Sequence, residues 1–168
     1  GGSVELCGRP LAELPPRQRA GTVGFVTTDK VRIANLPCRD VVALGRAPYT
    51  DWIGRMQAAD RAAVDRALEL VGMSAFARKT MDRMSDGECQ RVMIARALAQ
   101  DTPVILLDEP TAFLDLPNRY ELASLLRRLA RDEGKCILFS THDLDIALSL
   151  CDAVALIDTP SLHLLPAG

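Results

Sequence analysis

Two acidic residues stand directly behind a short apolar run near the middle of the chain. Residues 104–107 are valine, isoleucine and two leucines, and Asp108 and Glu109 follow them. A run of this length is too short to span a membrane and is typical of a strand covered on both faces. In an open α/β sheet, ligands bind at the carboxyl ends of the strands, where a carboxylate pair can hold Mg²⁺ and activate water. We therefore predict a site for metal-assisted hydrolysis, with an ordinary acidic turn as the alternative.

A capping box upstream of these acids predicts the start of a helix. Ser85 and Glu88 have the spacing at which each side chain accepts a hydrogen bond from a free backbone N–H group. Apolar residues recur on one face as far as about residue 100, and residues 101–103, which include a proline, end the helix. The helix start attracts anions such as phosphate, although Asp86 and Glu88 weaken that attraction. The alternative is an ordinary helix that runs from surface to core.

A histidine follows the next predicted strand. Residues 136–139 are mostly apolar, and His142 comes shortly after them. Helical and extended patterns alternate in this half of the chain, which indicates parallel strands joined by right-handed crossovers. His142 is therefore expected at the same sheet edge as Asp108 and Glu109, although a lone histidine at such a position is more often structural.

A mainly parallel sheet and several helices must position these groups. We predict a buried strand at residues 136–139 and further strands at 4–7, 22–26 and 153–157. Residues 29–83 are mostly helical, with one helix at 39–44 that ends at Gly45 and another at 61–71 that ends at Gly72. Later helices are predicted from Leu116 to about Gly134 and over residues 144–150. The predicted fold class is α/β.

The composition indicates one globular domain. The chain has 168 residues, of which 48% are hydrophobic and 25% are charged, and its net charge is -2. This charge argues against a nucleic-acid-binding surface, and no apolar run is long enough to cross a membrane. The 5 cysteines include no CxxC pair, so we expect reduced thiols and no zinc site.

Taken together, the motifs resemble those of the nucleotide-binding subunits of ABC transporters. The signature motif of that family is matched by residues 84–88, and its Walker B motif by residues 104–109. Its D-loop is matched by residues 112–115 and its switch histidine by His142. The resemblance covers nearly the whole chain and implies a P-loop NTPase-like fold. In such a fold, residues 29–100 would form an inserted helical subdomain with the signature helix, and 101–168 the second half of the core.

The resemblance also implies roles for residues that act on a nucleotide within one subunit. Asp108 matches the ligand of Mg²⁺, Glu109 the general base toward water, and His142 the group that contacts the γ-phosphate of ATP. The family has a glutamine that touches Mg²⁺ and the attacking water, and Thr28 aligns best with it. Threonine offers one hydroxyl on a shorter side chain, so a different geometry is expected there.

A second set of residues is implied to act across a dimer. In the family, two subunits close head to tail, and each ATP lies between the P-loop of one and the signature helix of the other. Ser85, Gly87 and Glu88 match the signature residues that face the partner's γ-phosphate, and Asp115 matches the residue that communicates across the dimer. The implied partners are a second ATPase subunit, in a homodimer, and membrane permease subunits. The implied location is the cytoplasmic face of the cell membrane.

The phrase from Leu44 to Tyr49, LGRAPY, resembles the importer branch that handles iron-siderophores, haem and cobalamin. Tyr49 and Trp52 are expected to be packing residues. No GxxxxGK[ST] phosphate loop occurs in the 168 residues, so the chain is expected to begin after that loop and to hydrolyse ATP poorly by itself. Two alternatives stay open, a non-catalytic module that lends its signature face to an intact partner and a soluble ABC ATPase of DNA repair or translation. The importer-like phrase and the lack of long heptads count against the latter.

Overall fold

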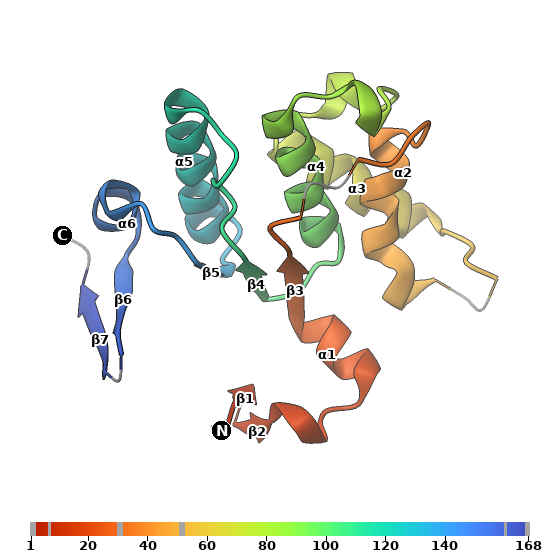
Figure 1. The fold of residues 1–168 in the computed structure, drawn as a ribbon. Coiled ribbons are helices and arrows are strands. Elements are labelled where there is room, and N and C mark those ends of the chain that lie inside the picture. Colours follow the sequence, from red (N-terminus) through yellow and green to blue (C-terminus); the bar gives the residue numbers. More distant parts are fainter. Residues whose placement is uncertain (1–2, 7, 30–31, 51–52, 160, 167–168) are drawn as a thin grey trace.

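Three short parallel strands form the centre of the fold. The computed structural model describes residues 3–6, 8–29, 32–50, 53–159 and 161–166. Strands β3 (Val23–Val26), β4 (Val104–Leu107) and β5 (Cys136–Phe139) pair in that order (Figure 1). The predicted strands at these places and the α/β class are confirmed.

The other helices and strands among the described residues surround this sheet or extend from its ends. They are β1 (Glu5–Leu6), β2 (Arg9–Pro10), η1 (Leu11–Glu13), α1 (Pro16–Thr22), α2 (Cys38–Ala43), η2 (Leu44–Tyr49), α3 (Ala58–Leu70), η3 (Ser74–Phe76), η4 (Met81–Arg83), α4 (Asp86–Ala99), α5 (Leu116–Asp132), α6 (Leu144–Leu150), β6 (Ala153–Asp158) and β7 (Ser161–Pro166). No helix in the described part of the chain is both long and apolar enough to span a membrane.

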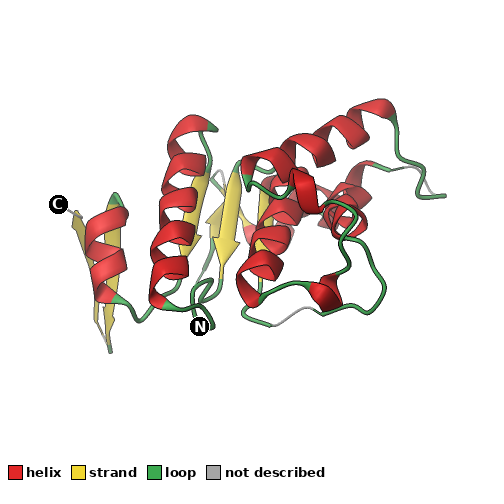
Figure 2. Cartoon of the chain, turned by 90° about the horizontal axis from the view of Figure 1, so that it is seen from above, coloured by secondary structure: helices red, strands yellow, loops and turns green. Residues whose placement is uncertain are grey.

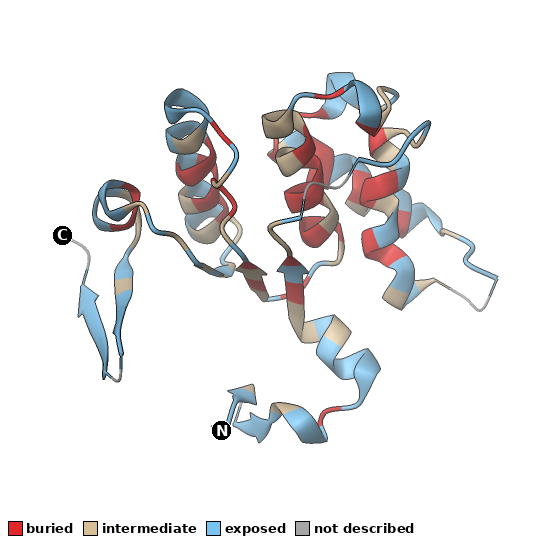
Figure 3. Ribbon diagram, viewed as in Figure 1, coloured by how far each residue is buried: buried red, intermediate tan, exposed pale blue. Residues whose placement is uncertain are grey.

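The hydrophobic core lies on one face of the parallel sheet. Side chains of paired residues in the strands point to the same face, and Val26 and Leu107 are both buried there. Buried residues of α2, α3, α4 and α5 join this cluster, and Figure 3 shows buried residues concentrated in this part of the molecule. The opposite face is more open, because Phe25 is 51% exposed and Leu138 is 60% exposed. Our expectations of a β4 covered on both faces and of a buried β5 were therefore wrong.

The C-terminal strand also differs from the sequence-based prediction. We expected residues 153–157 to be part of a parallel sheet, but β6 pairs antiparallel with β7, a strand that we did not predict. In Figure 2 this hairpin stands at one end of the molecule, near the C-terminus. A strand gains its hydrogen bonds from whichever neighbour the chain brings alongside, and here β7, which follows β6 closely in the sequence, pairs with it from Asp158 and Ser161 onward.

Gly45 does not end a helix as we predicted. The chain continues from α2 directly into η2, and Gly45 is buried inside that turn. A Cβ atom at Gly45 would lie 2.2 Å from the backbone oxygen of Arg96. The glycine is therefore required by the close approach of η2 to α4, and the prediction failed because a glycine for packing and a glycine for capping look alike in a sequence.

A buried ion pair next to this glycine joins the helices to one another. The Nε atom of Arg46 donates to Asp60 Oδ1 at 2.9 Å, and its NH1 group donates to the carbonyl oxygen of Ala99 at 2.8 Å. The guanidinium also lies 4.0 Å from the ring centroid of Tyr49, which agrees with a packing role for that ring; Trp52 lies outside the described residues. Hydrogen bonds from the Gln57 backbone and from Arg46 lower the pKa of Asp60. The group thus ties η2 and α3 to the end of α4.

Replacement of Gly45 by alanine should destabilise the fold. The added Cβ would overlap a backbone atom of α4, and such overpacking costs about 1–3 kcal/mol. Gly21→Ala is a matched control, because Gly21 lies in α1 with open space around it, and alanine there should stabilise by up to about 1 kcal/mol. Urea unfolding of both variants measures the difference. Equal midpoints for the two variants would contradict the close approach.

Candidate functional site

Asp108 extends from the carboxyl end of β4 and receives two hydroxyl hydrogen bonds. Its backbone N–H donates to the carbonyl oxygen of Val26 at 2.9 Å, which continues the strand pairing by one residue. Thr28 Oγ1 donates to Asp108 Oδ2 at 2.7 Å, and Ser140 Oγ donates to Oδ1 at 2.8 Å. These bonds, first from Thr28 and then from Ser140, lower the pKa of the carboxyl. Asp108 is therefore held as a carboxylate in a fixed orientation.

Glu109 and His142 form a second, more open pair beside Asp108. His142 Nδ1 lies 3.6 Å from Glu109 Oε1, and the two side chains are 70% and 41% exposed. The backbone of Glu109 has a positive φ of 41°, which is unusual for a residue with a side chain. A carboxylate beside an imidazole, both open to solvent, can accept a proton from a water molecule.

The oxygen donors at this edge suit a magnesium ion. Mg²⁺ prefers oxygen ligands and is usually held by one or two carboxylates together with waters and substrate phosphates. Asp108, with the Thr28 and Ser140 hydroxyls around it, offers such a donor set. Within the described ranges no cluster of three or more histidine, cysteine, aspartate or glutamate side chains could cage a metal alone.

The predicted capping box is present at the start of α4. Ser85 Oγ accepts from the Glu88 N–H at 3.2 Å, and Glu88 Oε2 accepts from the Ser85 N–H at 2.8 Å. Lys79 Nζ also binds both carboxylate oxygens of Glu88, at 2.9 and 2.8 Å, and this contact is the main reason that the pKa of Glu88 is lowered. The Glu88 carboxylate is therefore occupied within its own chain.

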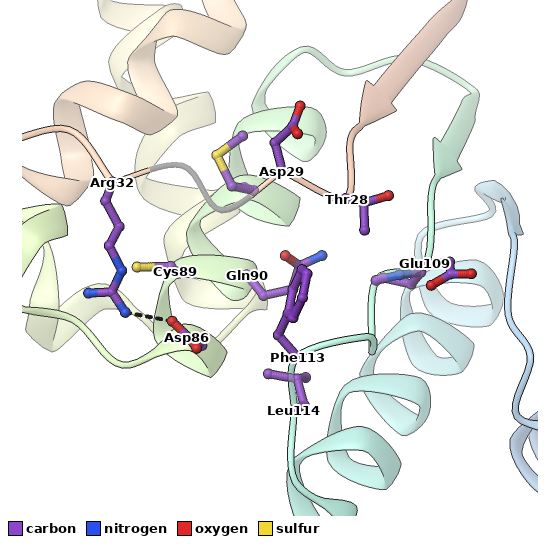
Figure 4. Close-up of a pocket in the computed structure, with 11 residues that line it drawn as sticks. Thr28, Asp29, Arg32, Asp86, Cys89, Gln90, Glu109, Phe113 and Leu114 are labelled. Carbon is purple, nitrogen blue, oxygen red and sulfur yellow. Dashed lines mark hydrogen bonds and ion pairs between the residues drawn. The ribbon is translucent and has the colours of Figure 1, made fainter.

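The other acid in this first turn is paired as well. Arg32 donates to Asp86 Oδ1 at 2.5 Å and to the carbonyl oxygen of Met84 at 3.2 Å. Figure 4 shows this pair at one side of a pocket whose other side carries Thr28 and Glu109. Because Arg32 and Lys79 each pair with one acid, the negative charge that weakens the helix start as an anion site is offset.

The start of α5 lies next to the start of α4. Asp115 caps α5, because its Oδ1 accepts from the Asn118 N–H at 3.1 Å and from the Asn118 side chain at 2.6 Å. A Cβ atom at Gly87 would lie 3.7 Å from Leu114 and 3.8 Å from Asn118 Oδ1. Two capped helix starts therefore meet at one surface, and the positive dipole end of a helix attracts anions.

The predicted site residues thus fall into two groups. Thr28, Asp108, Glu109 and His142 lie together at the carboxyl edge of the sheet, and Ser85, Gly87, Glu88 and Asp115 lie at the two helix starts. We gave no role to Ser140, Arg32 or Lys79. Ser140 could have been found, because it is the first residue after β5 and lies opposite Asp108 in the parallel register. The partners of Arg32 and Lys79 depend on how the loops fold back, and no local sequence pattern predicts that.

Comparison with known proteins finds a family and relatives that this chain resembles. A family model described as ABC transporter matches residues 1–112. An uncharacterized ABC transporter ATP-binding protein of Methanocaldococcus jannaschii is 42% identical over 93% of this chain and 54% of its own length. A hemin import ATP-binding protein of Nocardia farcinica is 40% identical over 94% of this chain and 54% of its own length.

Three further relatives and a solved structure also resemble this chain. Other relatives have names that specify siderophore transport, iron(3+)-hydroxamate import and cobalamin import. The solved structure of an inward-facing, putative metal-chelate type ABC transporter has a TM-score of 0.81 and 27% identity, over 87% of this chain and 59% of that chain. The chain spans about half the length of the curated relatives that it matches.

Replacement of Thr28 by valine should raise the pKa of Asp108. The variant lacks the hydroxyl that most strongly favours the carboxylate, so the pKa should move toward the ordinary value of about 3.9. A lowered folded-state pKa stabilises the fold above about pH 3.9 and loses this effect as the pH falls through the folded-state value. The stability difference between the two proteins should therefore shrink in acid.

Titration of the Asp108 carboxyl by NMR measures this shift directly. Thr50→Val is the control, because the Thr50 hydroxyl donates only to the nearby carbonyl oxygen of Ala47 among the bonds described for it. An Asp108 titration that is the same in wild type and Thr28→Val would show that the hydroxyl does not act on the carboxylate.

Proposed function

Because this chain belongs to the ABC transporter family, we propose that it is part of an ATP-hydrolysing subunit that powers the import of a solute. The single observation that carries the proposal is the group at the sheet edge. Asp108, Glu109 and His142 come from the ends of two parallel strands, and Thr28 from the end of a third. This is the edge at which ligands bind in open α/β sheets.

The residues at this edge have distinct parts in the proposed reaction. The Asp108 carboxylate would hold Mg²⁺, which supplies charge neutralisation on the phosphates when it is bound. Glu109 would accept the proton of the attacking water, and His142 would orient the Glu109 carboxylate and contact the terminal phosphate. Thr28 takes the place of a glutamine in the family, and its hydroxyl reaches the Asp108 carboxylate directly.

The helix starts would serve a second subunit. Ser85 and Gly87 present the N-terminal end of α4, and the pairing of Asp86 and Glu88 with cations supports an anion site there. We propose that a second copy of the protein places its nucleotide against this surface, with Asp115 at the contact. Glu88 would act indirectly, since it fixes the Ser85 backbone and its carboxylate is already bound.

These 168 residues do not contain the loop that binds the nucleotide phosphates in P-loop ATPases. A P-loop ATPase holds its nucleotide with a glycine-rich loop and a lysine, and no GxxxxGK[ST] pattern occurs in the sequence. We propose that the 168 residues alone bind and hydrolyse ATP poorly. A second candidate function is a non-catalytic module that lends its signature surface to an intact partner, and the two capped helix starts at α4 and α5 support that role.

The names of the relatives support a proposal about the transported solute. Names that specify siderophore, hemin and cobalamin import support an iron chelate, haem or cobalamin as the transported solute. We propose that the protein acts at the cytoplasmic face of the cell membrane, bound to permease subunits. We also propose residues 29–100 as the helical subdomain that contacts the permease and 101–168 as part of the ATPase core.

Replacement of Glu109 by glutamine in the full gene product should leave nucleotide binding intact and lower turnover by roughly 10²-fold or more. Glutamine keeps the size of the side chain and removes the proton acceptor. His142→Ala should act similarly. Calorimetric titration with MgATP and a phosphate-release assay separate binding from turnover.

Glu121→Gln is the matched control, because Glu121 is an exposed acid on α5 that pairs with Arg91. It should keep wild-type turnover. A Glu109→Gln protein with most of its activity would refute the role of Glu109 as general base, and a wild-type protein without turnover would favour the non-catalytic module.

A further inference from the structure

Ser140 connects the two acids through a single hydroxyl. Ser140 Oγ donates to Asp108 Oδ1 at 2.8 Å and accepts from the backbone N–H of Glu109, also at 2.8 Å. A serine hydroxyl has one donor and two acceptor lone pairs, so it can make both bonds together. The side chain of one acid and the backbone of the other therefore share one anchor.

The anchor is itself fixed by the sheet. Leu107 pairs with Phe139 at the ends of β4 and β5, and the Ser140 N–H donates to the carbonyl oxygen of Leu107 at 3.0 Å. This bond places Ser140 level with Asp108 at the carboxyl edge. Ser140 is thus held by the parallel register and does not depend on a flexible loop.

The Glu109 backbone needs such an anchor. Its φ of 41° lies in the left-handed region, which residues with a side chain rarely adopt. Strained backbone of this kind persists only where surrounding groups hold it, and it is frequent at active sites. Here the N–H is held by Ser140, and the carbonyl oxygen accepts from the Ala112 N–H at 3.1 Å.

We propose that Ser140 is a positioning residue that holds Glu109 in the backbone conformation from which its carboxylate faces His142. The inference rests on the proposed function for its catalytic consequence. Loss of the hydroxyl would free the Glu109 N–H and remove one support of the Asp108 carboxylate at the same time. The direction of the Glu109 side chain, which sets the 3.6 Å separation from His142, would then be less defined.

The test compares three variants in the full gene product. Ser140→Ala removes the hydroxyl, and Ser140→Thr keeps it. Ser149→Ala is the control, since its hydroxyl donates to the Asp145 carbonyl oxygen within α6, away from the acids. Loss of outer hydrogen-bond partners at metal sites typically costs 10- to 100-fold in activity. We expect Ser140→Ala to lower kcat by roughly 10-fold or more with KM for MgATP changed less than about 2-fold, while Ser140→Thr and Ser149→Ala stay close to wild type.

One measurement without nucleotide separates this inference from the proposed function. In Ser140→Ala, hydrogen exchange of the Glu109 amide should become faster, because the amide loses its acceptor. This change supports the positioning role even if the wild type hydrolyses no ATP, an outcome that would contradict only the proposed function. Unchanged Glu109 exchange, a loss of kcat in Ser149→Ala equal to that in Ser140→Ala, or failure of Ser140→Thr to retain activity would each overturn the inference.

Discussion

The parallel register of β3, β4 and β5 is the constraint on which the candidate site depends. Val26 pairs with Leu107, and Leu107 pairs with Phe139, so the three strands end level with one another. The residues just beyond these ends then meet at one edge, although they come from distant parts of the sequence. A shift of one strand by one residue would turn its buried side chains to the open face and separate Asp108 from its hydroxyl partners. The chemistry at the edge and the burial of the core are therefore fixed by the same hydrogen bonds.

The helical part of the chain is connected to this edge by a few specific contacts. The Arg46–Asp60 pair and the close approach of Gly45 attach η2 and α3 to α4, and α4 packs on β3. At its other end, α4 is capped by Ser85 and joined through Arg32 to the segment that follows Thr28. Because Arg32 bonds to Asp86, a movement of Arg32 would also displace the first turn of α4.

Much of the fold could be predicted from the sequence, because the local signals were strong. The capping box at Ser85, the proline after Leu116 and the apolar runs of the parallel strands each indicate one element, and the structure has them. Burial of β5 and the partner of β6 could not be predicted, because both depend on which elements lie alongside and not on the strand's own residues. The prediction for Gly45 was wrong for a similar reason, since this glycine contacts a helix about fifty residues away in the sequence.

The residues of the candidate site also differ in how far the sequence could predict them. Asp108, Glu109 and His142 could be identified from the sequence because each follows a predicted strand. Ser140 could have been found from its place directly after β5, but the cations that pair with Asp86 and Glu88 could not, because their contacts join different loops. Hydrogen bonds between side chains of different loops leave no periodic trace in a sequence.

We propose that a nucleotide-bound metal ion is held at the carboxyl edge of the three strands. The most direct test adds Mn²⁺ and ATP to the isotope-labelled full gene product and records paramagnetic broadening of its amide signals. We expect the amide signals of Thr28, Asp108, Glu109 and Ser140 to broaden first, while the β6–β7 hairpin keeps its signals. Broadening centred away from these strand ends, or none at saturating Mn²⁺ and ATP, would contradict it.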